Sequence, residues 1–207
     1  FDDATALDET LRALDDLVRA GKILYPACSN FAAWQVARAL GLAALKNLAP
    51  LVAIQPMYNL VKRAAEIEIL PMAHSLGLAV VPYSPTGDGL LTGKYGVGRA
   101  PQHGRLKDTK MYSIRYGNPA FYDVAERFTQ LAAELGHHPV TLAAAWVASH
   151  PAVTSVLVGG RSVEAPPERG VRHDPADERD GDHVQGVGVE ADVCTVRDHE
   201  VHRVAGR

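Results

Sequence analysis

Four short, mainly apolar segments, separated by segments with helical spacing, most constrain what this chain can fold into. They lie at residues 22–28, 51–54, 78–81 and 153–158. Each has the length of a strand and ends in polar or small residues. Apolar strands that alternate with helices are typical of a parallel sheet with helices on its faces. The sequence therefore predicts an α/β fold with these four parallel strands.

The segments between these strands predict the helices. In the first of them, apolar residues recur every three or four positions, at Leu7, Leu11, Leu14 and Val18. Thr5 and Asp8 match a capping box at its start, and Gly21 suits its C-terminal end. Further helices are expected from residue 34, over 66–76, over 121–135 and from Pro139 onward. A glycine-rich, basic loop is expected over residues 84–118.

The amino-acid composition changes sharply after Glu164. Residues 165–207 contain no Leu, Ile, Met, Phe, Tyr, Trp or Lys and carry a net charge of -4, whereas residues 1–164 carry +1. A segment whose only large apolar residue is valine cannot bury enough surface to offset the entropy lost on folding. We therefore expect a folded domain at 1–164, followed by a disordered tail at 165–207.

Charge and cysteine content exclude several kinds of protein. The chain has a formal net charge of -3, so no basic surface for nucleic acid is expected. Its two cysteines, Cys28 and Cys194, cannot form a disulfide framework, and neither has a partner at metal-ligand spacing. No apolar run reaches the roughly 20 residues that cross a membrane, and the first residues do not match a signal peptide. We expect a cytoplasmic protein without a metal site, a nucleic-acid partner or a membrane partner.

Polar or small residues stand at the end of each predicted strand. They are Ser29-Asn30, Gln55, Tyr83-Ser84 and Gly159-Gly160-Arg161. In parallel α/β folds, ligands bind at the carboxyl ends of the strands. The spacing therefore predicts that these four strand ends contribute to one site.

Four motifs follow one another along the chain. They are Cys-Ser-Asn-Phe at 28–31, Gln-Pro-Met-Tyr-Asn-Leu at 55–60, the segment 83–95, and Val-Gly-Gly-Arg-Ser at 158–162. In this order they resemble the SNF, QxxYN, YSPLxxGLLTGKY and VGARS-type signatures of the aldo-keto reductase family. The resemblance covers residues 1–164. It is closest in style to the branch that includes the potassium-channel β subunits and bacterial relatives.

The resemblance implies a (β/α)8 TIM barrel that uses NADPH to reduce an aldehyde or ketone to an alcohol. It places residues 1–164 in the C-terminal half of the barrel, with the strands conventionally numbered five to eight. The substrate would be a small carbonyl compound. The chain would be a truncated form of such an enzyme.

By the same resemblance, Ser29, Asn30 and Gln55 would hold the nicotinamide carboxamide, which suits Asn and Gln because they offer both donors and acceptors. Tyr83 would stack beneath the nicotinamide ring. The pyrophosphate would be wrapped by the loop residues Ser84, Pro85, Thr86, Gly87 and Asp88, much as other glycine-rich turns bind anions. Lys94, together with Arg105, would add positive charge. In the closing loop of Gly159, Gly160 and Arg161, the arginine would meet the 2′-phosphate.

No catalytic residue is expected within the chain. Carbonyl reduction needs a proton donor beside the carbonyl oxygen, and the family supplies it from a Tyr, Lys, Asp and His set on earlier strands. None of these residues can be carried onto this sequence. After Glu164 the family pattern also stops, and two prolines follow at Pro166 and Pro167. We interpret the tail as a shifted reading frame, with a true divergent tail as the alternative.

These departures leave three hypotheses open. The first is an NADP-dependent aldo-keto reductase. The second is a catalytically incompetent half-barrel that binds a nucleotide or a partner protein. The third is a gene remnant. Half a barrel would leave its first and last strands with unpaired edges, so self-association is expected.

Overall fold

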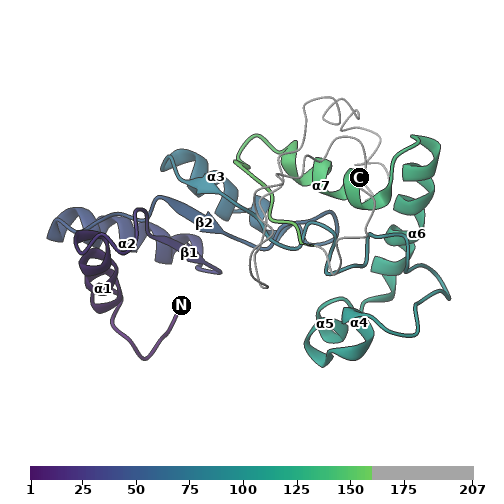
Figure 1. Cartoon of the computed structure of the whole chain (residues 1–207), viewed down its shortest axis with the longest axis horizontal. Helices are drawn as coiled ribbons and strands as arrows, with labels where there is room; N and C mark the ends of the chain where they lie inside the picture. Colours follow the sequence, from purple (N-terminus) through teal and green to yellow (C-terminus); the bar gives the residue numbers. More distant parts are fainter. Residues whose placement is uncertain (160–207) are drawn as a thin grey trace.

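The computed structural model describes residues 1–159. The predicted cofactor residues Gly160 and Arg161, and the whole predicted tail at 165–207, lie outside the described residues. Figure 1 shows an elongated arrangement. The N-terminal helices and the strands lie toward one end, and the helices that follow residue 100 lie toward the other.

The strands form a parallel sheet. β1 (Ala27–Ser29), β2 (Ala53–Gln55) and β3 (Ala79–Val80) pair in the order β1-β2-β3. Their register sets Cys28 beside Ile54, and Ile54 beside Val80. The connections contain α2 (Ala33–Lys46), then the 3-10 helix η1 (Ala64–Glu66) and α3 (Ile69–Ser75). The predicted α/β class and the parallel pairing of the first three strands are confirmed.

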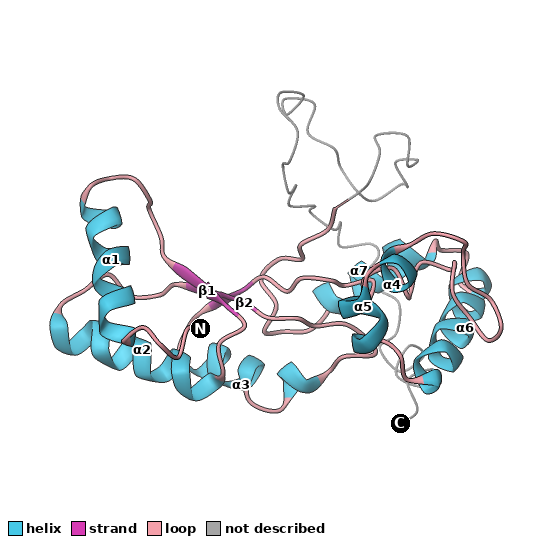
Figure 2. Cartoon of the chain, turned by 90° about the horizontal axis from the view of Figure 1, so that it is seen from below, coloured by secondary structure: helices cyan, strands magenta, loops and turns pink. Residues whose placement is uncertain are grey.

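The two faces of the sheet differ. Ile54 and Val80 are buried in the core, whereas Ala27 and Ser29 are exposed. Figure 2 shows α2 and α3 on the same side of the strands. Side chains alternate between the faces of a strand, so small and polar residues fall on the second face. Helices on one face of a parallel sheet are also the arrangement found in a (β/α)8 barrel.

The N-terminal region has a small core of its own. α1 (Leu7–Arg19) packs on α2 through a cluster of Leu7, Leu11, Ala39 and Leu51. The predicted capping box at its start is wrong. The N-cap is Ala6, one residue after Thr5, and alanine has no side-chain acceptor; the hydroxyl of Thr5 donates to Asp2. Gly21 adopts the left-handed conformation predicted for it, with a φ of 67°.

A larger core joins the sheet to the C-terminal helices. α6 (Pro119–Glu134) and α7 (Pro139–Ala148) confirm the last two predicted helices. Phe128 and Val147 are completely buried. The ring of Tyr58 packs against that of Trp146, with centroids 5.2 Å apart. This core holds the chain that follows β2 in a fixed position.

The segment over residues 84–118 is not a continuous loop. It contains two short helices, α4 (Arg105–Asp108) and α5 (Lys110–Arg115). They have four and six residues, too few for an apolar periodicity to be visible in the sequence. The predicted loop is therefore wrong over these residues.

Two predicted strands differ from the structure. The first, at 22–28, begins only at Ala27, because Leu24 and Tyr25 are 78% and 74% exposed. The last, at 153–158, is not a regular strand, although it follows β3. The N–H of Thr154 donates to the carbonyl of Val80 at 2.9 Å, and that of Leu157 to Pro82 at 3.0 Å. Proline has no N–H with which to return a bond, so the ladder is interrupted.

Candidate functional site

The ends of β1 and β2 bring two predicted site residues side by side. Ser29 and Gln55 are partners in the parallel register. The hydroxyl of Ser29 donates to the backbone carbonyl of Gln55 at 2.9 Å. Ser29 is exposed and Gln55 half-buried, so the amide of Gln55 lies at an accessible strand end. We call Ser29, Asn30 and Gln55 the strand-end edge.

Tyr83 connects this edge to the end of β3. Its hydroxyl donates to the Oδ1 of Asn30 at 3.0 Å. Its backbone N–H donates to the carbonyl of Pro56 at 3.0 Å. Asn30 has a φ of 59°, a left-handed conformation that asparagine tolerates better than most residues. The ring of Tyr83 is thus anchored at its hydroxyl and at its backbone, beside the side chain of Asn30.

The chain turns sharply after Tyr83, over residues 84–91. Ser84 and Asp88 have φ values of 57° and 55°. The hydroxyl of Ser84 donates to the Oδ1 of Asp88 at 2.7 Å, and the N–H of Gly87 donates to the carbonyl of Ser84 at 2.9 Å. Pro85 is buried within this turn. We call residues 84–91 the 84–91 loop.

Three backbone N–H groups in the part of this loop that follows Pro85 have no hydrogen-bond acceptor within residues 1–159. They belong to Thr86, Asp88 and Gly89. Neighbouring N–H groups without an acceptor carry partial positive charge and form concavities that bind anions. The loop is therefore suited to a phosphate group.

A buried asparagine holds the loop from below. Asn59 is completely buried. Its Nδ2 donates to the carbonyl of Ser84 at 2.9 Å and to the hydroxyl of Tyr116 at 3.2 Å. Its Oδ1 accepts from the N–H groups of Val61 at 3.2 Å and Lys62 at 3.0 Å. Every donor and acceptor of a buried amide is thus used, which fixes the loop at Ser84.

Tyr116 extends this network and is also completely buried. Burial raises the pKa of its hydroxyl far above the usual value, and the charge of Asp88 raises it further. The hydroxyl therefore stays protonated and donates to the Sδ of Met57 at 3.8 Å. A general acid works best with a pKa near the operating pH, so Tyr116 is suited to a structural role.

A second buried group fixes the segment between β2 and α3. The hydroxyl of Tyr58 donates to the Oε1 of Glu66 at 2.7 Å. The guanidinium of Arg63 binds both carboxylate oxygens of Glu66, at 2.7 and 2.8 Å. Burial alone would raise the pKa of Glu66, but these hydrogen bonds and the charge of Arg63 outweigh it and lower the pKa.

Three other predicted cofactor residues, Lys94, Arg105 and Gly159, make no hydrogen bond or ion pair with the strand-end edge or the 84–91 loop within residues 1–159. Lys94 and Arg105 are exposed on the chain that follows the loop, and Gly159 is exposed at the end of the described range. Sequence reasoning placed Asn59 in a motif without a role and did not single out Arg115 or Tyr116. The position of Asn59 just after a predicted strand could have indicated its role, because an asparagine side chain commonly binds backbone groups a few residues ahead in a turn.

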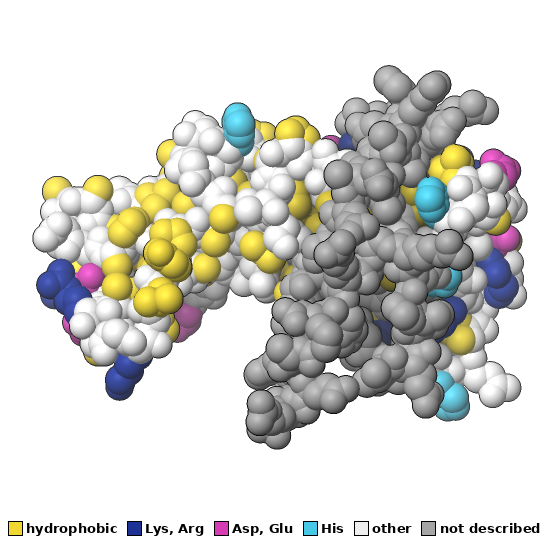
Figure 3. Space-filling view, turned by 45° about the horizontal axis from the view of Figure 1, so that its top comes forward, with side chains coloured by type: hydrophobic (Ala, Val, Ile, Leu, Met, Phe, Trp, Pro, Cys, Tyr) yellow, Lys and Arg dark blue, Asp and Glu magenta, His cyan; other side chains and the backbone are white. Residues whose placement is uncertain are grey.

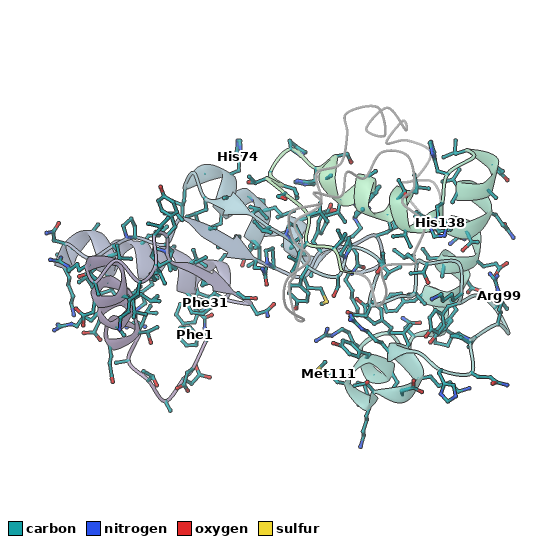
Figure 4. The ribbon with its side chains drawn as sticks, in the orientation of Figure 1. Phe1, Phe31, His74, Arg99, Met111 and His138 are labelled. Carbon is teal, nitrogen blue, oxygen red and sulfur yellow. The ribbon has the colours of Figure 1, made fainter. Side chains whose placement is uncertain are left out.

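A larger cavity lies away from this site. It is a groove of about 570 Å³ between the first eight residues and α2, lined by residues that include Phe1, Trp34 and Arg38. Phe1 and Phe31 pack edge to face, with centroids 5.1 Å apart (Figure 4). None of the predicted cofactor residues that the structure describes lines this groove. The candidate site is instead an open surface at the strand ends.

A much smaller cavity lies directly behind the strand-end edge. Cys28, Asn30 and Gln55 are among the residues that line it. Burial raises the pKa of the Cys28 thiol to about 11, so it stays protonated at neutral pH. A protonated thiol is a poor nucleophile and a poor metal ligand. Within residues 1–159, no group of three His, Cys, Asp or Glu side chains could hold a metal ion.

The fold and the site define an α/β protein with a loop of free backbone N–H groups and with amide side chains at the ends of parallel strands. Comparison with known proteins identifies the family. The Aldo/keto reductase family matches residues 1–165, so the chain belongs to this family of oxidoreductases. Membership implies a (β/α)8 barrel and confirms the resemblance found in the sequence. No helix within residues 1–159 is long and apolar enough to span a membrane.

Three relatives show the range of the similarity. The "Uncharacterized oxidoreductase YrpG" of Bacillus subtilis (strain 168) is 36% identical over 164 residues, which cover 79% of this chain and 48% of that protein. The "Probable voltage-gated potassium channel subunit beta" of Oryza sativa subsp. japonica is 34% identical, covering 76% and 49%. "Protein tas" of Escherichia coli (strain K12) is 34% identical, covering 78% and 46%. The chain spans about half the length of the curated relatives it matches.

Proposed function

We propose that this chain carries the cofactor side of an NADP(H)-dependent carbonyl reductase. The observation that carries the proposal is the 84–91 loop, whose free N–H groups lie next in sequence to Tyr83 and its contact with Asn30. Such a loop suits a pyrophosphate, and the amides of Asn30 and Gln55 suit a carboxamide. Membership of the family supports this assignment, because aldo/keto reductases generally use NAD(P)H.

Each group has a distinct part in this proposal. Asn30 and Gln55 orient the carboxamide, and Tyr83 offers its ring as a platform. The N–H groups of Thr86, Asp88 and Gly89 bind the pyrophosphate. Lys94, Arg105 and the closing loop of Gly159, Gly160 and Arg161 supply further contacts and positive charge. The bound cofactor supplies the hydride for a small carbonyl substrate. In this arrangement residues 1–164 form strands five to eight of the barrel, at one side of a complete site.

The test is a fluorescence titration of the full chain with NADPH. Binding should shift and enhance the emission of the reduced nicotinamide. Gln55→Ala should weaken binding about tenfold, because a lost hydrogen-bonding amide is worth roughly 1.4 kcal/mol. The control is Gln130→Ala on α6, an exposed amide, which should bind as the unaltered chain does. Absence of any NADPH binding up to millimolar concentration would exclude the proposal.

A second candidate function is binding without turnover. It is favoured by Tyr116, the buried tyrosine nearest the loop in the hydrogen-bond network, whose raised pKa makes it a poor acid. A panel of aldehydes, with NADPH saturating, separates the two functions. An enzyme consumes NADPH and loses this activity on Tyr83→Ala. A binding module shows the fluorescence change but no consumption.

We also propose that the chain self-associates. Within residues 1–159, β1 pairs with β2 alone, and Leu24 and Tyr25 just before it are exposed. Figure 3 shows hydrophobic side chains gathered on the N-terminal part of the surface. Open strand edges and apolar patches favour association. Sedimentation at several concentrations should show species larger than a monomer, and a single monomeric species throughout would contradict this.

A further inference from the structure

A buried carboxylate lies inside the 84–91 loop. The side chain of Asp88 is 3% exposed. Its Oδ1 accepts from the hydroxyl of Ser84 at 2.7 Å, and its Oδ2 lies 3.5 Å from the Nη1 of Arg115. The backbone of Asp88 also has a positive φ. The loop that offers free N–H groups thus contains a negative charge of its own.

Arg115 is held in position from several sides. It is the last residue of α5, and its Nη2 lies 4.0 Å from the Sδ of Met111. Its guanidinium lies 5.6 Å from the ring centroid of Tyr112. The next residue, Tyr116, is held by Asn59, which also binds the carbonyl of Ser84. The short helix α5 is therefore joined to the loop both by a charge pair and by the buried network.

These two charges matter for an anion at the loop. A carboxylate in the same turn repels a pyrophosphate, and the repulsion is strong where water is excluded. The guanidinium of Arg115, 3.5 Å from the Oδ2 of Asp88, offsets that charge. Within residues 1–159, Lys62 is a further charged group beside this network, with its Nζ 5.7 Å from the ring centroid of Tyr116.

We infer that Arg115 is a positioning residue that enables anion binding by compensating the charge of Asp88, without itself touching the ligand. The inference rests on the proposed function, and it deepens that proposal by assigning a residue that no sequence motif marked. It makes the effect of Arg115 conditional on Asp88. A direct phosphate ligand would act whether or not Asp88 is charged.

The experiment is a double-mutant cycle on the full chain with NADPH as the probe. The variants are Arg115→Gln, Asp88→Asn and the pair combined, each checked by thermal unfolding. Asn at position 88 still accepts from Ser84 and tolerates a positive φ. Arg63→Gln, which breaks the Arg63–Glu66 ion pair outside the loop, is the matched control for loss of a paired guanidinium.

We expect Arg115→Gln to raise the Kd for NADPH about tenfold or more, and Arg63→Gln to leave it unchanged. Asp88→Asn should bind at least as tightly as the unaltered chain. The combined variant should bind like Asp88→Asn, a rescue that a merely structural role of Arg115 would not produce. If Arg115→Gln does not fold, the NADPH affinities of Asp88→Asn and of the combined variant still show whether Arg115 acts only through the charge of Asp88.

Two results would overturn the inference while the proposed function stands. One is unchanged NADPH affinity in Arg115→Gln. The other is a combined variant that binds much more weakly than Asp88→Asn, which would make Arg115 a direct ligand contact. If the unaltered chain binds no NADPH, the proposed function fails first, and the inference is overturned with it.

Discussion

The strand-end edge and the Asn59 network contribute to one candidate site but are held in opposite ways. Ser29 and Asn30 are exposed, and each makes one side-chain hydrogen bond within residues 1–159. Asn59 is buried and makes four. The difference teaches that the loop is preorganised by the core, whereas the edge is left accessible. Mutations in the Asn59 network should therefore change stability, and mutations in the strand-end edge should change binding.

The largest effect is expected at Asn59. Asn59→Ala removes four hydrogen bonds. It leaves the N–H of Val61 without its partner, and the carbonyl of Ser84 keeps only the bond from Gly87. We expect a loss of about 3 kcal/mol in the free energy of unfolding, measured by urea denaturation. Asn30→Gly, which keeps the positive φ accessible, is the control at the exposed edge. Equal losses in both variants would break the comparison.

A pH-dependent effect is expected at Glu66. Its pKa is lower in the folded chain than its usual value, so its stabilisation is present above about pH 4.3, the unfolded value. The stabilisation is lost as the pH falls through the lower folded value. Glu66→Gln should cost about 2 kcal/mol at neutral pH.

In Glu66→Gln, the free energy of unfolding should also fall less steeply as the pH drops below about 4.3. Urea denaturation between neutral pH and the acid range measures both effects. A variant whose stability falls with acid as steeply as that of the unaltered chain would show that Glu66 is not the group responsible.

A smaller effect is expected at the start of α6. The Oδ1 of Asn118 accepts from the N–H of Ala120 at 3.0 Å and caps the helix. Asn118→Ala should lower the free energy of unfolding by about 1 kcal/mol, and Asn118→Asp, which keeps the acceptor, should restore most of it. Thermal unfolding followed by circular dichroism measures both. An Asn118→Ala variant as stable as the unaltered chain would show that the cap does not stabilise the start of α6.

The smallest effect on stability is expected at Ser29. Its hydroxyl is exposed, so Ser29→Ala should change the free energy of unfolding by less than about 0.5 kcal/mol. It should nevertheless weaken NADPH binding, because the hydroxyl sits at the strand-end edge. A titration of the folded variant tests this. If Ser29→Ala lowered stability but left NADPH affinity unchanged, the strand-end edge would have a structural role, like the Asn59 network.

The sequence predicted the parts of the fold that depend on local pattern. The helix α6 was found from its apolar spacing, and α7 was found because Pro139 suits the first turn of a helix. The strand at 22–28 was predicted too long because apolar composition does not tell whether a backbone is paired. The strand at 153–158 was predicted as regular because the missing N–H belongs to Pro82, on a different segment. Pairing between distant segments such as these cannot be predicted from the residues of one segment alone.

The candidate site divides in the same way. The partnership of Ser29 with Gln55 followed from the rule that parallel strand ends share an edge. Thr5 shows the limit of local patterns, because the helix begins one residue later than its pattern with Asp8 predicts. The role of Arg115 could not be predicted, because its contact with Asp88 spans 27 positions and depends on a helix of six residues.

The bond from Tyr83 to Asn30 has a consequence for the time course of folding. It joins residues 53 positions apart, and the parallel strands between them pair only through crossovers. Contacts between distant positions form slowly, because loop closure costs entropy before any bond is gained. The strand-end edge is therefore expected to assemble after the local helices during refolding. In pulsed hydrogen exchange, the N–H of Tyr83 should become protected after those of α6 and α7.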